Sequence, residues 1–157
     1  MSNTYANNIT RLCELAFREY ARGLGLTQLS SSSILAGFDD ADVMTPRLVF
    51  NCDSAEPDGP ADDATWACQL EVQCVSNADD RTADQHHDFV SEVFSQMFIG
   101  RYEALPNVVN AAAAAANPVI PFQMFDILPA GQAKSIAERR WLSSQVFRVI
   151  CCGTPGE

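Results

Sequence analysis

The chain has 157 residues, of which 47% are hydrophobic, so it is long enough to bury one core and short for two. Ten basic residues stand against 20 acidic ones, and the formal net charge of -10 disfavours tight binding to nucleic acid or to anionic headgroups. No apolar stretch approaches the roughly 20 residues needed to cross a bilayer, which predicts a soluble protein without a membrane partner.

The first predicted element is a helix from Ile9 to Leu24. Its apolar residues recur at spacings of three and four, which places them on one buried stripe, and Gly23 and Gly25 are typical of a helix end. The next stretch, from Leu29 to Thr45, has the serines, glycine and aspartates of a solvated loop, with one apolar break that allows a short strand.

Two strands joined by an acidic connection are predicted next. The run from Arg47 to Cys52 is rich in β-forming residues. The run from Trp66 to Val75 alternates apolar and polar residues, which indicates a sheet with one face on the core and one face exposed or covered by a partner. We expect the two strands to pair, and the proline-bearing segment 53–63 to form a long loop or hairpin tip.

A second helix is predicted to begin at Thr82. Thr82 followed by Gln85 has the pattern of a capping box, and Asp84 lies in the first turn, where the helix dipole favours an anion. Gly100 is a natural end signal. A proline at position 106, followed by the alanine run Ala111 to Ala116, predicts a further short helix.

Two more strands are predicted in the C-terminal third, Val119 to Leu128 and Trp141 to Cys152, with the polar segment 129–138 as a hairpin tip between them. The order is therefore α-β-β-α-(α)-β-β. Because the strands come in pairs, we predict an α+β fold: a single domain with an antiparallel or mixed sheet and helices packed on one face. Residues 1–8 are expected to form a flexible N-terminus.

Six cysteines are spread along the chain, and no apolar leader precedes them, so we expect reduced thiols. Four of them lie in apolar alternating runs, where cysteine acts as a small buried hydrophobe. Cys151 and Cys152 would face opposite sides of a strand. Cys68 and Cys74 would stand about 20 Å apart on one extended strand. The spacing therefore predicts core packing and no zinc site.

No pattern of catalytic residues is present. The sequence has no G-x-S-x-G, Walker, G-x-G-x-x-G or H-E-x-x-H motif. His86 and His87, flanked by four aspartates, are the obvious metal-like group, but adjacent residues on a helix diverge by about 100 degrees and do not easily ligate one ion together. We therefore predict a protein that is not an enzyme, without a catalytic residue, a metal site or a cofactor.

Charge is distributed unevenly along the chain. From Asp39 to Asp88 there are thirteen acidic residues against two arginines, whereas four basic residues and one acidic residue lie between Lys134 and Arg148. Such asymmetry favours head-to-tail pairing between identical subunits, although an ordinary mixed surface would give the same counts. The predicted subunit interface comprises Lys134, Arg139, Arg140, Trp141 and Arg148.

The strand from Trp66 to Ser76, followed by residues 78–82 and a helix through His86 and Val93, resembles the tail terminator (tail completion) proteins of long-tailed bacteriophages. The ending from Arg139 to Ile150 resembles their final strand, and the order of elements is similar from Ile9 to Cys152. The resemblance implies a virion structural protein, assembled in the host cytoplasm. Its subunits would form a ring, by the family's habit a hexamer, that caps the tail tube.

The same resemblance implies partners and excludes chemistry. The ring would contact the tail tube protein, present a joining surface to a neck or head-closure protein, and let DNA pass through without specific binding. It implies no enzymatic activity and no cofactor. Two other hypotheses stay open: another head-tail joining or neck protein, and a small cytoplasmic thiol- or metal-dependent enzyme that uses Cys151 and Cys152 or the two histidines.

Overall fold

The computed structural model describes residues 9–37, 46–58, 65–137 and 140–153. The segment 1–8, expected to be flexible, lies outside the described residues. In chain order the elements are α2 (Ile9–Arg22), a 3-10 turn (Ser31–Ser33), β1 (Ile34–Ala36), β2 (Arg47–Pro57), β3 (Trp66–Asn77), α3 (Ala83–Met97), α4 (Leu105–Ala115), β4 (Phe122–Ala137) and β5 (Arg140–Gly153). None of the described helices is long and apolar enough to cross a membrane.

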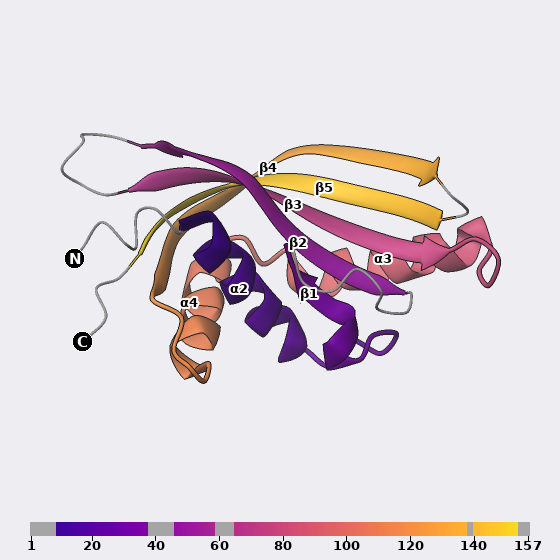
Figure 1. Cartoon of the computed structure of the whole chain (residues 1–157), viewed down its shortest axis with the longest axis horizontal. Helices are drawn as coiled ribbons and strands as arrows, with labels where there is room; N and C mark the ends of the chain where they lie inside the picture. Colours follow the sequence, from indigo (N-terminus) through magenta and orange to yellow (C-terminus); the bar gives the residue numbers. More distant parts are fainter. Residues whose placement is uncertain (1–8, 38–45, 59–64, 138–139, 154–157) are drawn as a thin grey trace.

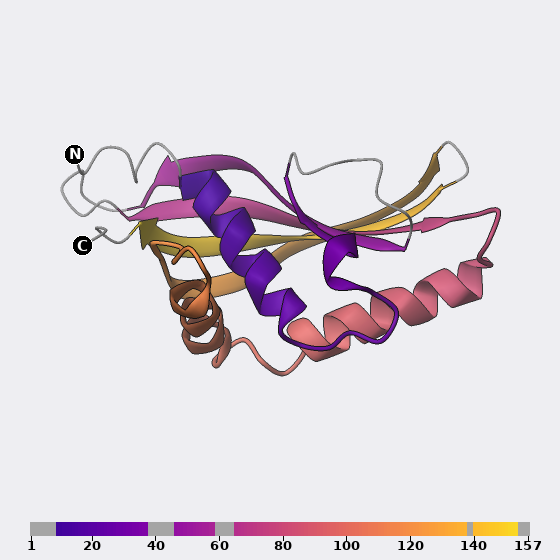
Figure 2. The same cartoon turned by 60° about the horizontal axis from the view of Figure 1, so that its bottom comes forward.

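The five strands form one sheet in the order β1-β2-β3-β5-β4. Strand β1 is parallel to β2, and the other neighbours are antiparallel. Helices α2, α3 and α4 lie on the same face of this sheet, and none of the described helices covers the opposite face (Figures 1 and 2). The α+β fold with a mixed sheet and helices on one face, predicted from the order of elements, is therefore confirmed.

Helix α2 carries the predicted apolar stripe and lies on β2 and against α4. Its central residue Phe17 is fully buried and lies 6.0 Å, between ring centroids, from Phe50 of β2. The Phe98 ring, just after α3, lies 6.4 Å from Phe17 and stacks on Phe147 of β5 at 4.4 Å. These aromatic contacts join helix, strand and loop into one core.

Two arginines of α2 bind the short edge strand β1. The Nη1 atom of Arg11 donates a hydrogen bond to the carbonyl of Ala36, and Nη2 of Arg22 donates one to the carbonyl of Ile34, each over 2.8 Å. Carbonyl groups at a sheet edge that accept bonds from side chains are not available to another strand. The arginines therefore both anchor β1 and close this edge of the sheet.

Helix α3 begins where the capping box predicts. The N–H of Gln85 donates to Oγ1 of Thr82 over 3.2 Å, and the N–H of Thr82 donates to Oε1 of Gln85 over 2.9 Å. This reciprocal pair satisfies two backbone donors that the first turn would leave unpaired. The far end of α3 is held by a long-range bond, in which the hydroxyl of Tyr20 donates to the carbonyl of Met97 over 3.0 Å.

Two strands are longer than predicted. Residues 53–57 continue β2 after a bulge between Cys52 and Ser54, so the loop predicted at 53–63 is wrong for these five residues. Residues 129–137 continue β4, so the hairpin tip predicted at 129–138 is wrong as well. Proline is tolerated in an edge strand or at a bulge, and Pro129 lies in the edge strand at a register shift.

Candidate functional site

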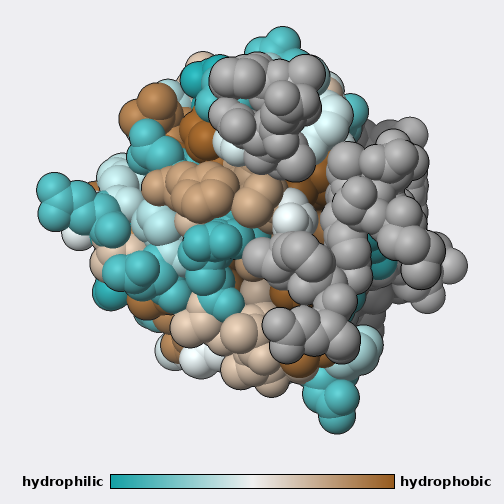
Figure 3. Space-filling model, turned by 90° about the vertical axis from the view of Figure 1, so that its left-hand side faces the viewer, coloured by the Kyte–Doolittle hydropathy of each residue, from teal (hydrophilic) through white to brown (hydrophobic). Residues whose placement is uncertain are grey.

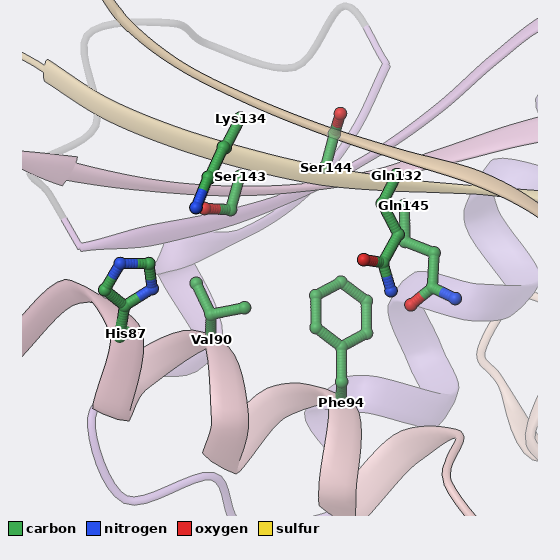
Figure 4. A pocket seen from close by; sticks show the side chains of 8 residues that line it. All are labelled: His87, Val90, Phe94, Gln132, Lys134, Ser143, Ser144 and Gln145. Atoms are coloured by element: carbon green, nitrogen blue, oxygen red, sulfur yellow. The ribbon is translucent and has the colours of Figure 1, made fainter.

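A groove runs between α3 and the β4–β5 hairpin. Its volume is about 390 Å³, and its floor is formed by three residues of α3 that lie on one helix face, His87, Val90 and Phe94. The opposite wall consists of polar side chains that point from the two strands towards α3: Gln132, Lys134, Ser143 and Gln145 (Figure 4). Ser144 points to the other side of the sheet in this view. The groove thus offers apolar contact on one wall and hydrogen-bonding groups on the other.

A buried histidine, next to His87 in the chain, ties α3 to the sheet. Nδ1 of His86 lies 2.8 Å from Oγ of Ser76 on β3, and Nε2 lies 3.0 Å from Oγ of Ser143 on β5. A neutral imidazole donates through one ring nitrogen and accepts through the other, and serine hydroxyls can do either. His86 is 3% exposed. Burial lowers the pKa of His86 below its ordinary 6.5, and the nearby His87 and Arg81 lower it further.

The serine–histidine contact differs from the catalytic triad of a hydrolase. A triad needs a third group, usually a carboxylate, that orients the base and stabilises its protonated form. Ser76 occupies that position here and carries no charge. The lowered pKa of His86 also opposes the proton transfer that a general base must accept. We therefore assign this network to packing of α3 on the sheet.

Trp141 extends the same network. Its ring stacks on His86 at 6.4 Å, and its Nε1 donates to the carbonyl of Arg81 over 3.1 Å. The guanidinium of Arg81 in turn lies 5.7 Å from the ring of Phe89. These contacts fix the loop before α3 against the first residues of β5.

The predicted interface residues that the structure describes lie at two separate places on β4 and β5. Lys134 and Trp141 both border the hollow at the N-terminal end of α3, and Arg140 is exposed at the start of β5. Arg139 lies outside the described residues. Arg148 is far along β5, where its Nη2 lies 3.4 Å from Oδ1 of Asp58 in an exposed ion pair. Arg148 follows Arg140 by eight positions along the strand, or roughly 26 Å.

The two histidines that formed the metal-like group diverge. His86 is buried under the sheet, whereas His87 is exposed beside Asp88. Within the described residues these side chains are not among those close enough to hold one ion together.

Four cysteines meet in the core, which the sequence reasoning missed. The Sγ atoms of Cys13, Cys52 and Cys68 all lie within 4.8 Å of one another, and Sγ of Cys151 lies 3.5 Å from that of Cys68. The neighbouring thiols of Cys13, Cys151 and Cys52 lower the pKa of the Cys68 thiol, whereas the pKa values of Cys13, Cys52 and Cys151 are raised. The remaining buried cysteine, Cys74, stands apart on the same strand, and burial raises its pKa.

One signal in the sequence does point to this cluster. Each of the four cysteines occupies a core-facing position of a separate predicted element, so all four belong on one face of the sheet or on the helix covering it. Whether they meet depends on strand order and register, which spacing along the chain does not contain.

Two of the large apolar side chains that are exposed lie on the outer strand β4. Phe125 and Leu128 are each 49% exposed and lie three positions apart. Other exposed apolar residues are scattered over α4 and the loops: Ile99, Val108 and Val119. The end of the molecule seen in Figure 3 likewise alternates brown apolar and teal hydrophilic surface. Exposed side chains of this size are candidates for contact with another protein.

No family model matches the sequence, and no curated protein sequence matches it significantly. The fold does have a structural counterpart. It is similar to a chain in the solved virion of a native gene transfer agent (GTA) particle, with a TM-score of 0.52 and 8% sequence identity. The match covers 88% of this chain and 92% of that chain. The two proteins share a fold.

The likeness extends over nearly the whole of both chains, so it describes the complete arrangement of helices and sheet rather than one motif. At 8% identity it carries no residue from one protein to the other. The surfaces and the cysteine cluster described above therefore have to be interpreted from the physical chemistry of this chain alone.

Proposed function

We propose that this protein is a structural component of a phage-like virion and acts as a tail terminator, a ring that caps the tail tube and joins it to the neck. The observation that carries the proposal is the fold shared, over 88% of this chain and 92% of the other, with a chain of a virion. The unit of β3, loop and α3 adds support, because it forms where the sequence resembles terminator proteins.

The ring contact of this proposal lies on β4. Two register shifts, at Met124/Asp126 and at Pro129/Gly131, interrupt the ladder of this edge strand. The side chain of Asn110 on α4 also binds both backbone polar groups of Met124. It donates to the carbonyl over 3.0 Å and accepts from the N–H over 2.7 Å. Bulges, proline and covered backbone groups oppose strand addition. Contact between subunits would therefore use side chains, with Phe125 and Leu128 at its centre.

The proposal is tested by the size and shape of the purified full-length protein. Native mass spectrometry and negative-stain imaging should show a closed ring, with six copies expected. A strictly monomeric protein that also fails to bind tail tubes would overturn the proposal.

Matched variants locate the contact. Phe125→Ser should shift rings towards monomers because it removes apolar area from the interface, whereas Ile99→Ser, at a residue 65% exposed, should leave rings intact. Rings that persist in Phe125→Ser and in Leu128→Ser would exclude β4 as the contact.

A second measurement separates the tail role from another virion joint. A terminator ring should bind the ends of tail tubes and stop their growth when added to polymerising tube protein. Rings that ignore tubes and bind a portal complex would instead identify a neck or head-closure protein.

A further inference from the structure

The four clustered cysteines come from four different elements. Helix α2 supplies Cys13, and the three adjacent strands β2, β3 and β5 supply Cys52, Cys68 and Cys151. Their exposed fractions are 0%, 6%, 1% and 0%, in that order. Four of the six cysteines thus occupy one place in the core, although up to 83 residues of chain separate contacting members.

The register of the sheet produces this convergence. Residue Trp66 pairs with Cys151, and Leu70 pairs with Cys52, so Cys68 stands two positions from each of these pairs on β3. Residues two apart on a strand share a face, which places the three sulfurs side by side under α2. Cys13 then lies on them from the helix.

The spacing of the sulfur atoms matches a metal site. A zinc ion binds thiolates at about 2.3 Å in a tetrahedron, which sets the distance between sulfurs at about 3.8 Å. The sulfur atoms of Cys68 and Cys151 are 3.5 Å apart, and those of Cys13, Cys52 and Cys68 all lie within 4.8 Å of one another. Cys151 is not part of this mutually close group of three, so an ion held by all four sulfurs requires the Cys151 side chain to shift towards the other sulfurs.

A disulfide explains the arrangement less well. Cys68 contacts three other thiols, Cys13, Cys151 and Cys52, and a disulfide would satisfy only one of these contacts. A tetrahedral ion takes all four sulfurs at once. Thiolate sulfur is also the ligand that soft and borderline metals such as zinc prefer.

A surface hollow of about 530 Å³ lies beside the site. Cys68 is among the residues that line it, together with Ser54 and Ala55, which follow the bulge in β2. The bulge begins directly after Cys52, and bulges re-aim the residues beside them.

We propose that Cys13, Cys52, Cys68 and Cys151 form a structural site for a thiophilic divalent metal ion, with Zn²⁺ as the ion that fits. Binding replaces thiol protons, which pass to the solvent, by bonds from thiolates to the metal. The ion joins α2 to three strands and stabilises the subunit. The site performs no catalysis, because all four ligand positions are filled by protein.

The test uses the full-length protein purified under reducing conditions from cells supplied with zinc. Elemental analysis should find about one zinc per chain. After removal of zinc, addition of Co²⁺ should produce the absorption of thiolate-bound tetrahedral cobalt. Protein that holds no zinc and gives no such absorption would overturn the proposal, as would an intact mass lower by the two hydrogens of a disulfide.

Two variants on the same strand control for loss of folding. Cys68→Ala should lower the affinity for zinc at least tenfold, whereas Cys74→Ala should keep it, although both cysteines are 1% exposed or less. A circular dichroism spectrum verifies that each variant is folded. If Cys68→Ala does not fold, the test is made on the wild-type protein. A strong zinc chelator should then lower the Tm of the wild-type protein. An unchanged Tm would contradict a structural ion.

Discussion

The Oε2 atom of Glu14 accepts a hydrogen bond from the backbone N–H of Cys52 over 2.7 Å. The carboxylate is 5% exposed, and Arg11 lies 3.4 Å from its other oxygen. A buried carboxylate is stable only when it is paired and hydrogen-bonded. Glu14 thus joins α2 to the middle of β2 by a buried hydrogen bond, at the point where the bulge interrupts the strand.

Gly37 leaves room for the Glu14 carboxylate. It has a φ of 51°, and a Cβ atom at this position would clash with the Glu14 carboxylate. We expect Gly37→Ala to lower the free energy of unfolding by about 2–4 kcal/mol, from backbone strain and the displaced carboxylate together. Gly100→Ala is the control, because Gly100 has a φ of 74° but open space around its Cβ position. It should cost about 1–2 kcal/mol in urea unfolding; equal losses would refute the role of Glu14.

The stacked aromatic rings dominate the core. Phe98→Ala removes a fully buried ring that stacks on Phe147 at 4.4 Å, and should lower the free energy of unfolding by about 3–5 kcal/mol. Phe125→Ala removes a ring of the same size that is 49% exposed, and the isolated subunit should lose less than about 1 kcal/mol. Denaturant unfolding of monomeric protein measures both. Similar losses would show that Phe125 is part of the core.

The capping box at the start of α3 should contribute measurably to the stability of the protein. Thr82→Ala leaves the N–H of Gln85 without its acceptor and should cost about 1 kcal/mol. Ser91→Ala, at an exposed position within the same helix, should be neutral or slightly stabilising, since alanine has the higher helix propensity. Thermal unfolding compares the two, and a Thr82 variant as stable as the wild type would argue against the cap.

Stability should depend on pH through His86. Its pKa is lowered in the folded protein, so the unfolded chain binds a proton more readily as pH falls through the ordinary value of 6.5. The stability contributed by neutral His86 is therefore present above about pH 6.5 and lost below it. Between about pH 7.5 and 5.5, the Tm of His86→Gln should fall less than that of the wild type.

His87→Gln provides the matched comparison for this titration, because His87 is exposed on the same helix. Each variant removes one imidazole, a buried one in His86→Gln and an exposed one in His87→Gln, so the difference between their pH profiles reports the buried ring. Parallel pH profiles in His86→Gln and the wild type would contradict the assignment.

Local signals predicted the elements but not the ends of two strands. The alternation in β3, the apolar stripe of α2 and the capping box at Thr82 each act within a few residues, and each was found where predicted. The segments after Cys52 and Leu128 contain proline and small or polar residues, which predict loops. Both became strand because a neighbour supplies the hydrogen bonds, β3 in one case and β5 in the other.

The amino-acid sequence by itself determined the class of fold, the buried faces of α2 and β3, and the start of α3, because periodicity and capping are local properties of a chain. The tertiary structure alone decided which buried groups meet. Four cysteines on four elements became one cluster, and His86 found serines on two strands. Strand order and register set these meetings, and neither is written in the spacing between residues.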